Sequence, residues 1–419
     1  MWNILKFKPV KRTGFWTIVQ GCLFAIAALI SVMTIMTTRS NLANRMMLTD
    51  TSHDPGPAEA TCVFDSLETA RTRPLLRAVV AYFSVSQTAV YFDQLKWCMR
   101  SLLEIATTEP ALWRTDLIIY IENVTIPDLL DLGCSTTPRQ NASEPFKCLL
   151  VEYERVQDRV LSANATEYER NLHEQMKEYP FIDSIYALVE HASTYSNYDY
   201  VVRSDLDVFF PPAFSHWIPP NCAFVTGNGA YSDPYNMEKL AMVANYSGIH
   251  FNTTIWNIGS TWIGSPHLIA KVAARTVHWM IHLSKNEFAP KQRTSAWWSM
   301  ALLWPEWHYG VVLLYGGHLA VNEVLQSGKQ HPFLKLDLDH PTTSTANCTL
   351  NGPIHLHTYQ NHDYFSKYVF SSRLYNETYS LPSVLNSTRC CDYAGYMAAD
   401  SLNMTCAELK TRLRTAKLS

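Results

Sequence analysis

The sequence has little charge and no marked excess of either sign. Only 17% of its 419 residues are charged and the formal net charge is -3, which excludes a bulk basic surface of the kind that binds nucleic acid. The 15 glycines and 21 prolines are too few for a fibrous protein, and the absence of a C-x-x-C pair argues against structural zinc. Because 47% of the residues are hydrophobic, the chain can bury a large core and is expected to be globular.

One long hydrophobic run is present near the N-terminus. Phe15 to Met36 contains no charged side chain, and at about 1.5 Å per residue it would extend roughly 33 Å, enough to cross a bilayer. Four basic residues precede it and favour a cytoplasmic N-terminus: Lys6, Lys8, Lys11 and Arg12. A cleaved signal peptide is the alternative, but its apolar region is typically only about 7 to 15 residues long. We therefore predict a cytoplasmic tail over 1–12 and a transmembrane anchor over 13–38.

The rest of the chain carries signs of export. Nine N-x-S/T sequons follow the hydrophobic run, at Asn123, Asn141, Asn164, Asn245, Asn252, Asn347, Asn376, Asn386 and Asn403. These are acceptor patterns for glycosylation in a lumenal or extracellular domain. Nine of the ten cysteines also follow the run, so at least one of them is unpaired or pairs between chains. The sequence thus predicts a glycosylated, disulfide-containing domain anchored in the Golgi or ER membrane.

The order of hydrophobic segments predicts an α/β fold. A polar stem is expected over 39–73, a lumenal domain over 74–395 and a C-terminal tail over 396–419. Strands are predicted in the first half at Ala78–Phe83, Asp116–Ile121, Cys148–Tyr153 and Tyr198–Val202, with helices at Tyr91–Ile105 and Phe181–His191. Further strands are predicted at Ala223–Thr226 and Trp256–Ile263, and further helices at Leu268–Leu283 and Gly310–Leu325. Strands that alternate with helices indicate a mostly parallel sheet flanked by helices.

Two acids follow the fourth predicted strand. Asp205 and Asp207 are two residues apart, so in an extended chain both carboxylates face one side. Open α/β sheets bind ligands beyond the carboxyl ends of their strands, which is where this pair would lie. The repulsion between the carboxylates calls for a cation, which Arg203 or a divalent metal could supply. Mn2+ and Mg2+ suit carboxylates completed by substrate phosphate oxygens.

These features together are similar to a known family. An anchor, a stem, a β-α-β first half and a strand ending in D-x-D resemble the GT-A-fold glycosyltransferases of the secretory pathway, over about 74–367. The resemblance implies that Asn257-Ile258-Gly259 contacts donor or acceptor sugar, with Asn257 and Gly259 as the contacting residues. It also implies a late histidine ligand for the metal, His357 by preference and His355 as the alternate. One histidine of the pair is then expected to be a core residue.

Several assignments stay open at this level. A second D-x-D, Asp337 with Asp339, also follows an apolar run and competes with the first. The group that handles the acceptor hydroxyl is expected at Glu323 with Asn322, or at Glu306. Tyr82 is either a nucleotide contact or a core tyrosine. The tryptophans at 297, 298, 304 and 307 form either a core cluster or a sugar platform in which Trp307 binds substrate.

The predicted activity is transfer of a sugar from a nucleotide diphosphate donor to a glycan, protein or lipid acceptor, with Mn2+ or Mg2+ as cofactor. Two alternatives are weighed against it. A glycan-binding ectodomain could use the same fold without turnover. A haloacid-dehalogenase-type phosphohydrolase also has D-x-D after a strand, but there the motif opens the domain, whereas Asp205 lies far inside this one.

Overall fold

The structure is a computed structural model that describes residues 67–293, 307–326, 333–359, 365, 367–372 and 388–416. Apart from Asn245–Gly248, these residues belong to one compact unit. The predicted cytoplasmic tail, the anchor and the stem up to residue 66 lie outside the described residues. No helix within the described ranges has the length and hydropathy needed to cross a membrane.

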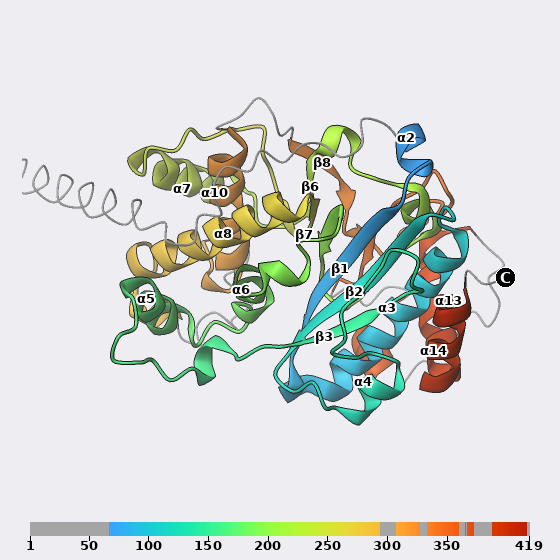
Figure 1. Ribbon diagram of the computed structural model, residues 1–419. Helices are drawn as coiled ribbons and strands as arrows, with labels where there is room; N and C mark the ends of the chain where they lie inside the picture. Colours follow the sequence, from blue (N-terminus) through green and yellow to red (C-terminus); the bar gives the residue numbers. More distant parts are fainter. Residues whose placement is uncertain are drawn as a thin grey trace, which may run out of the picture. The chain divides into compact units, whose positions relative to one another are not determined.

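A seven-stranded sheet forms the centre of the unit (Figure 1). Its strands lie in the order β3-β2-β1-β4-β7-β6-β8, and β7 runs antiparallel to both of its neighbours while the other pairs are parallel. The bounds are β1 Leu75–Phe83, β2 Trp113–Ile121, β3 Cys148–Glu152, β4 Tyr200–Arg203, β6 Phe224–Asn228, β7 Ile258–Gly264 and β8 Phe333–Leu338. The predicted α/β class with a mostly parallel sheet is confirmed.

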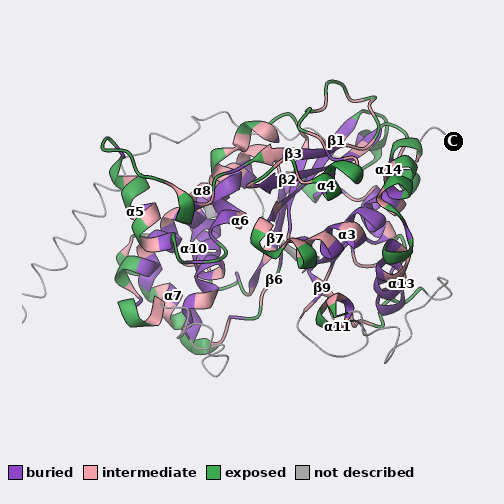
Figure 2. Ribbon diagram, turned by 90° about the horizontal axis from the view of Figure 1, so that it is seen from below, coloured by how far each residue is buried: buried purple, intermediate pink, exposed green. Residues whose placement is uncertain are grey.

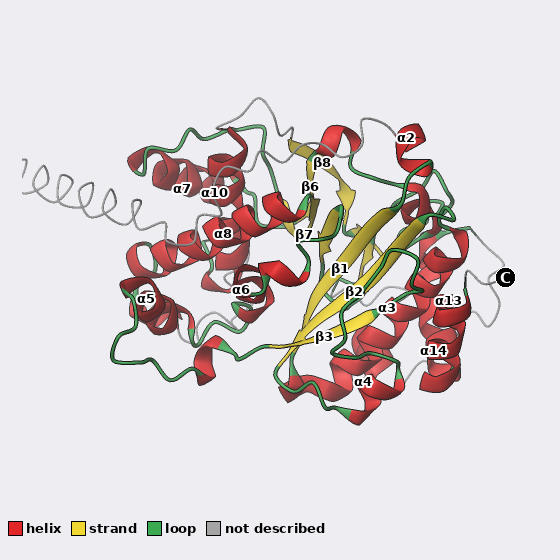
Figure 3. Cartoon of the chain, in the orientation of Figure 1, coloured by secondary structure: helices red, strands yellow, loops and turns green. Residues whose placement is uncertain are grey.

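Helices cover both faces of this sheet (Figure 3). One face carries α3 (Thr88–Thr108), α4 (Pro127–Asp131), α13 (Cys390–Asn403) and α14 (Cys406–Thr415). The other carries α5 (Glu167–Met176), α6 (Asp183–Glu190), α7 (Pro234–Tyr246), α8 (Pro266–Asn286) and α10 (Val312–Gln326). Two short helices, α2 (Leu67–Arg71) and α11 (Lys367–Ser371), complete the set in the described ranges.

The alternation of side chains along β1 divides the core in two. Val79 and Ala81 pack with the cluster that includes α3 and α13, whereas Ala78 and Val80 pack with the cluster that includes α8 and α10. Successive residues of a strand point to opposite faces, so a strand covered on both sides must be apolar throughout. Figure 2 accordingly shows buried residues along the strands and on the helices that face them.

A second, three-stranded sheet joins segments that are distant in sequence. It consists of β5 (Val208–Phe209), β10 (Leu356–His357) and β9 (His340–Pro341), in the order β5-β10-β9. β10 pairs antiparallel with β5 and parallel with β9. Residues about 150 positions apart therefore lie side by side immediately after the end of β4.

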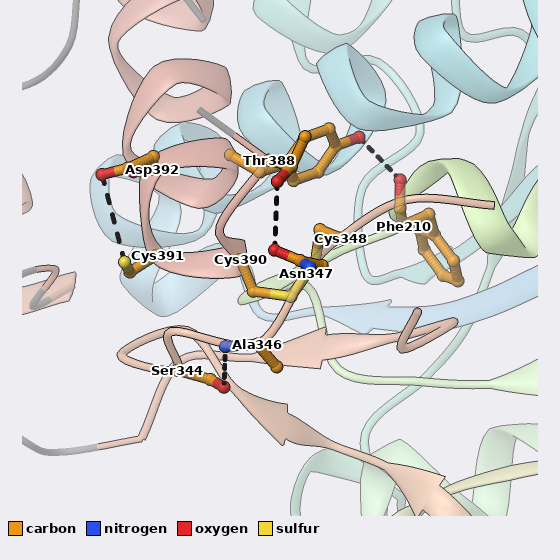
Figure 4. Close-up of a disulfide and its surroundings, with 10 residues drawn as sticks. Phe210, Ser344, Ala346, Asn347, Cys348, Thr388, Cys390, Cys391 and Asp392 are labelled. Carbon is orange, nitrogen blue, oxygen red and sulfur yellow. Dashed lines mark hydrogen bonds between the residues drawn. A yellow bond between two sulfur atoms is a disulfide. The ribbon is translucent and has the colours of Figure 1, made fainter. Parts of the chain in front are cut away.

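The C-terminal helices are packed onto the unit. Leu409 and Leu413 of α14 are buried, and α13 and α14 both contact α3. A disulfide joins Cys348 to Cys390 at the start of α13 (Figure 4), and a second joins Cys134 to Cys148. Cys98, Cys391 and Cys406 carry free thiols. The segment predicted as a C-terminal tail, 396–419, thus includes most of two helices that belong to the same compact unit.

Candidate metal centre

The D-x-D segment lies where β4 leaves the large sheet and β5 enters the small one. β4 ends at Arg203, and Asp205 and Asp207 fall between it and Val208, the first residue of β5. Val208 pairs with His357 across the antiparallel β5–β10 ladder. This pairing brings the end of β10 next to the D-x-D segment, because neighbouring strands are only about 5 Å apart.

Three potential ligands converge at this point. Asp205, Asp207 and His357 each offer a ligand atom within 4.8 Å of the other two. His357 Nε2 is 3.3 Å from Asp207 Oδ1 and 3.9 Å from Asp205 Oδ2. Since Mn2+ and Mg2+ hold ligands at about 2.0 to 2.2 Å, atoms at these separations reach one ion with shifts of a few tenths of an ångström. The side chain of Asp205 is 37% exposed and that of Asp207 is 9% exposed, so the cluster opens on the Asp205 side.

Two cations flank the acids. Lys367 Nζ lies 2.6 Å from Asp207 Oδ2, and one guanidinium nitrogen of Arg203 lies 3.6 Å from Asp205 Oδ1. Arg203 is buried and also donates to Ser260 O and to Ser184 Oγ at 2.9 Å, which fixes it as part of the wall. Lys367 is a functional candidate that the sequence reasoning missed. Its available signal was weak: it is the one lysine between Lys335 and Lys410.

The charges in this cluster shift one another's protonation. Burial alone would raise the pKa of Asp207, but the neighbouring His357 and Lys367 hold it below its usual range. Burial alone would lower the pKa of His357, but Asp207, Asp339 and Asp205 raise it to about 9. Lys367 likewise has a raised pKa because the charge of Asp207 outweighs its burial. The ion-free cluster is therefore held together by ionised groups of opposite sign.

The main chain of the D-x-D segment is held from the opposite strand. Thr358 donates to Asp207 O twice, from its backbone nitrogen at 3.0 Å and from Oγ1 at 2.8 Å. His355, the alternate ligand in the sequence analysis, is fully buried. Its Nε2 lies 3.1 Å from Ser204 Oγ and its Nδ1 lies 3.3 Å from Asp339 Oδ1. His357 therefore contacts the open cluster, whereas His355, which lies just before β10, is part of the buried wall behind it.

Tyr82 lies at the same edge of the sheet. It is near the end of β1, and its hydroxyl donates to Glu122, which directly follows β2, at 2.5 Å. Glu122 also accepts from Val85 N at 3.0 Å. Tyr91 of α3 is close to Glu122 and to the D-x-D acids. Burial, together with the negative charges of Asp205, Asp207 and Glu122, raises the pKa of Tyr91 to about 12. The carboxyl ends of β1, β2 and β4 therefore form one polar rim.

The Asn-x-Gly segment has structural contacts of its own. Asn257 adopts a φ of +48°, and its Oδ1 accepts from Ser232 N at 2.7 Å while its backbone nitrogen donates to Ser232 Oγ at 2.9 Å. Above Gly259, the space that a Cβ would need is taken by Asp339 Oδ2, which would be 2.5 Å away. These contacts hold the turn before β7 and the strand itself.

Other predicted site residues lie in the helical layer. Glu323 of α10 accepts two hydrogen bonds from Arg275, at 2.8 and 2.6 Å, and one from Trp279 at 2.8 Å. Asn322 is buried and accepts from Asn252 N at 2.7 Å. In the described part of the chain, the acids and imidazole that converge on one point are Asp205, Asp207 and His357. Both Asn322 and Glu323 are engaged by the packing of α10.

Of the four tryptophans in the predicted cluster, Trp307 lies in the described residues. Trp307 stacks on Phe288 with ring centroids 5.4 Å apart and on Tyr315 at 4.5 Å, and it packs against the core cluster of α8 and α10. Residues 297, 298, 304 and 306 lie outside the described residues.

The sequons are accessible where the structure describes them. Asn252 is half-buried, and six others are exposed: Asn123, Asn141, Asn164, Asn245, Asn347 and Asn403. In three sequons, the hydroxyl two residues on donates to the asparagine Oδ1: Thr125 to Asn123, Ser143 to Asn141 and Thr254 to Asn252. Asn376 and Asn386 lie outside the described residues.

Comparison with known proteins gives a family and a distant fold similarity. The model for "Domain of unknown function (DUF7164)" matches residues 71–419. No curated protein matches the chain. The fold is distantly similar to GT-A-fold glycosyltransferases, of which three solved structures serve as examples.

The first example is apo WbbM, a bifunctional glycosyltransferase, at 11% identity and a TM-score of 0.38 over 72% of this chain. The match covers 47% of the WbbM chain, so this chain corresponds to about half of that protein. Mouse xyloside xylosyltransferase 1 matches at 11% identity and a TM-score of 0.32, over 64% of this chain and 87% of its own. Core-mannan synthase A from Aspergillus fumigatus, in its Mn/GDP form, matches at 13% and 0.30, over 57% and 68%.

Proposed function

The chain belongs to the family of domain of unknown function DUF7164, a description that assigns no activity, and from this premise we propose that it is a metal-dependent glycosyltransferase. Its donor would be a nucleotide diphosphate sugar, and its acceptor a glycan, glycoprotein or glycolipid. The observation that carries the proposal is the convergence of Asp205, Asp207 and His357 at the carboxyl edge of a parallel sheet. Ligands of open α/β folds bind at that edge.

The ligand set fits a divalent ion of the Mn2+ or Mg2+ class. Asp205 and Asp207 supply carboxylate oxygens, which both ions accept, and the imidazole of His357 favours Mn2+ over Mg2+. Such an ion, when bound, neutralises diphosphate oxygens and so stabilises the charge that develops on the leaving nucleoside diphosphate. The exposed side of Asp205 leaves room for the phosphate oxygens that would complete the coordination of the ion.

The residues around the cluster would bind the donor and balance the charge of the acids. Lys367 places a second positive charge beside Asp207, from which its ammonium can turn to a phosphate oxygen of the donor. Tyr82 and Glu122, on the same rim, offer a phenol and a carboxylate to the hydroxyl and ring N–H groups of a nucleoside. Arg203 balances the charge of Asp205 from the wall.

The compartment follows from other features. Disulfides at Cys134–Cys148 and Cys348–Cys390 suit an oxidising environment, and accessible sequons suit a glycosylated domain. Together with the predicted anchor, these features support a type II protein of the Golgi or ER membrane with a lumenal catalytic domain.

The test is donor turnover by the purified full-length chain. It should be assayed with Mn2+ and a panel of UDP- and GDP-activated sugars, by release of the nucleotide with and without added glycan acceptors. We expect release from one donor class, abolition by EDTA, and a loss of at least about 100-fold in Asp207→Asn, because one charged ligand is lost.

A control variant separates the site from general damage. Glu190→Gln alters an exposed partner of Arg159 and should keep full turnover. Tight glycan binding without release of any nucleotide would favour the glycan-binding alternative. Release of phosphate from simple phosphate esters, lost in Asp205→Asn, would favour the phosphohydrolase.

A further inference from the structure

A buried chain of side chains lies directly behind the metal cluster. Asp339 follows β8, His355 precedes β10, and Ser204 follows β4. Asp339 Oδ1 is 3.3 Å from His355 Nδ1, and His355 Nε2 is 3.1 Å from Ser204 Oγ. All three residues are almost inaccessible, with exposures of 2%, 0% and 3%. The second Asp-x-Asp motif thus meets the first through one histidine.

The direction of the hydrogen bonds shows what this chain can do. The Ser204 hydroxyl donates to Asp205 O at 3.0 Å, so its only proton is used there. His355 Nε2 must therefore donate to Ser204 Oγ rather than accept from it. A serine nucleophile would need the reverse polarity and access to solvent, so the Ser-His-Asp order here does not form a hydrolytic triad. The chain ends instead on the peptide between Asp205 and Leu206.

Asp339 occupies a socket shaped for it. It adopts a φ of +58°, and its Oδ1 accepts from Thr261 Oγ1 at 2.5 Å. A Cβ on Gly227 would be 1.6 Å from Asp339 Oδ2, and one on Gly259 would be 2.5 Å away. Two strands therefore carry glycine where this carboxylate approaches, which indicates that its position is specifically built.

The chain ties together the two strands that supply the cluster. Ser204 immediately precedes Asp205, and His355 is two residues before His357 on the segment that pairs with β5. Movement of either strand end would stretch a hydrogen bond between buried groups. The separation between the Asp205 carboxylate and the His357 imidazole is thus set from behind.

We propose that Asp339, His355 and Ser204 are positioning residues that hold the ligand spacing required for metal binding. The inference rests on the proposed metal-dependent function and deepens it, because it gives the second Asp-x-Asp a role that is not ligation. Groups that orient metal ligands typically contribute about 10- to 100-fold to metal affinity.

The test is Mn2+ affinity of the purified full-length chain, measured by electron paramagnetic resonance of free Mn2+. Ser204→Ala removes the hydroxyl, and Asp339→Asn removes the charge while keeping a residue that tolerates positive φ. Both are expected to weaken Mn2+ binding by about 10-fold or more, and Ser204→Thr, which keeps a hydroxyl, should restore it. Ser401→Ala is the matched control, since that serine is equally buried but donates to Ala398 O within α13.

Thermal unfolding of the ion-free variants provides the second readout. A purely structural role would lower the unfolding temperature and leave the Mn2+ Kd of the folded fraction unchanged, and that result would overturn the inference. If wild type binds Mn2+ and both variants bind it equally well, only the inference fails. If wild type binds no Mn2+, the proposed metal-dependent function fails first and this inference with it.

Discussion

Two stretches of the chain have the same three residues but different surroundings. Asp205-Leu206-Asp207 follows β4. Asp337-Leu338-Asp339 begins with the last two residues of β8 and ends one residue after it. The central leucine is buried in both. The Asp205 side chain is 37% exposed, whereas that of Asp339 is 2% exposed. An acid beside a buried leucine can therefore face an open site or a closed one.

The partners of the acids explain the difference. Asp207 pairs with Lys367 and His357. Both of these side chains are partly exposed, so each can shift when an ion binds to Asp207. Asp339 pairs with Thr261 and His355, which are buried and cannot exchange this contact for one with solvent. A binding site needs partners that can be displaced, and a scaffold needs partners that cannot.

The largest expected contrast is in stability. Asp339→Ala should lower the free energy of unfolding by about 3 kcal/mol or more, because it leaves the buried Thr261 hydroxyl without its acceptor and empties the space that the carboxylate fills. Asp205→Ala should change it by less than about 1 kcal/mol, since that carboxylate is partly exposed and relieves repulsion when removed. Urea unfolding of the two ion-free variants measures both. Equal losses would erase the distinction between the two motifs.

A second contrast concerns the glycine socket. Gly227→Ala should cost about 2 to 3 kcal/mol, because the three atoms nearest to its new Cβ all belong to the Asp339 side chain. Adding Asp339→Ala to this variant should cause no further clash, so the double variant should be no less stable than Asp339→Ala alone. A double-mutant cycle in urea gives the coupling, expected at about 2 kcal/mol. If the losses in free energy of unfolding were additive, Gly227 would be required for a contact other than the one with Asp339.

The smallest effect is expected at Lys367. Lys367→Met removes a cation that competes for Asp207, so Mn2+ binding without nucleotide should tighten about 3- to 10-fold. Electron paramagnetic resonance titration measures this change. Lys96→Met is the matched control, because its ammonium donates to Met404 O on α14's side of the fold and should leave the Kd unchanged. Weaker binding in Lys367→Met would mean that the lysine supports the ion rather than replaces it.

The first half of the fold was predictable because its signals are local. The strands around Val79, Ile118, Leu150 and Val202 are continuous apolar runs, as strands buried on both faces must be. Asp205 and Asp207 were identified for the same reason, since a strand end and a spacing of two residues are visible in a short window. The pairing of His357 with them was expected from a resemblance to a family, not from its own surroundings.

The remainder depends on contacts between distant residues. β5, β9 and β10 have two residues each and show no period that a sequence pattern could detect. Lys367 is 160 residues from Asp207, and nothing around it in the sequence marks a site. The helix α5, in contrast, begins with a capping box at Thr166 and Glu169 that a closer reading of local signals would have found.

The Cys348–Cys390 bond has a consequence for the segment that it encloses. The two cysteines are 42 positions apart, and the covalent ring that they close contains both His357 and Lys367 but neither Asp205 nor Asp207. Closing a ring of this size removes about 4 kcal/mol of chain entropy from the unfolded state. The bond therefore limits the unfolded freedom of the segment that brings His357 and Lys367 to Asp207. Reduction of this bond would release that segment and raise the entropic cost of bringing the two side chains to the acid.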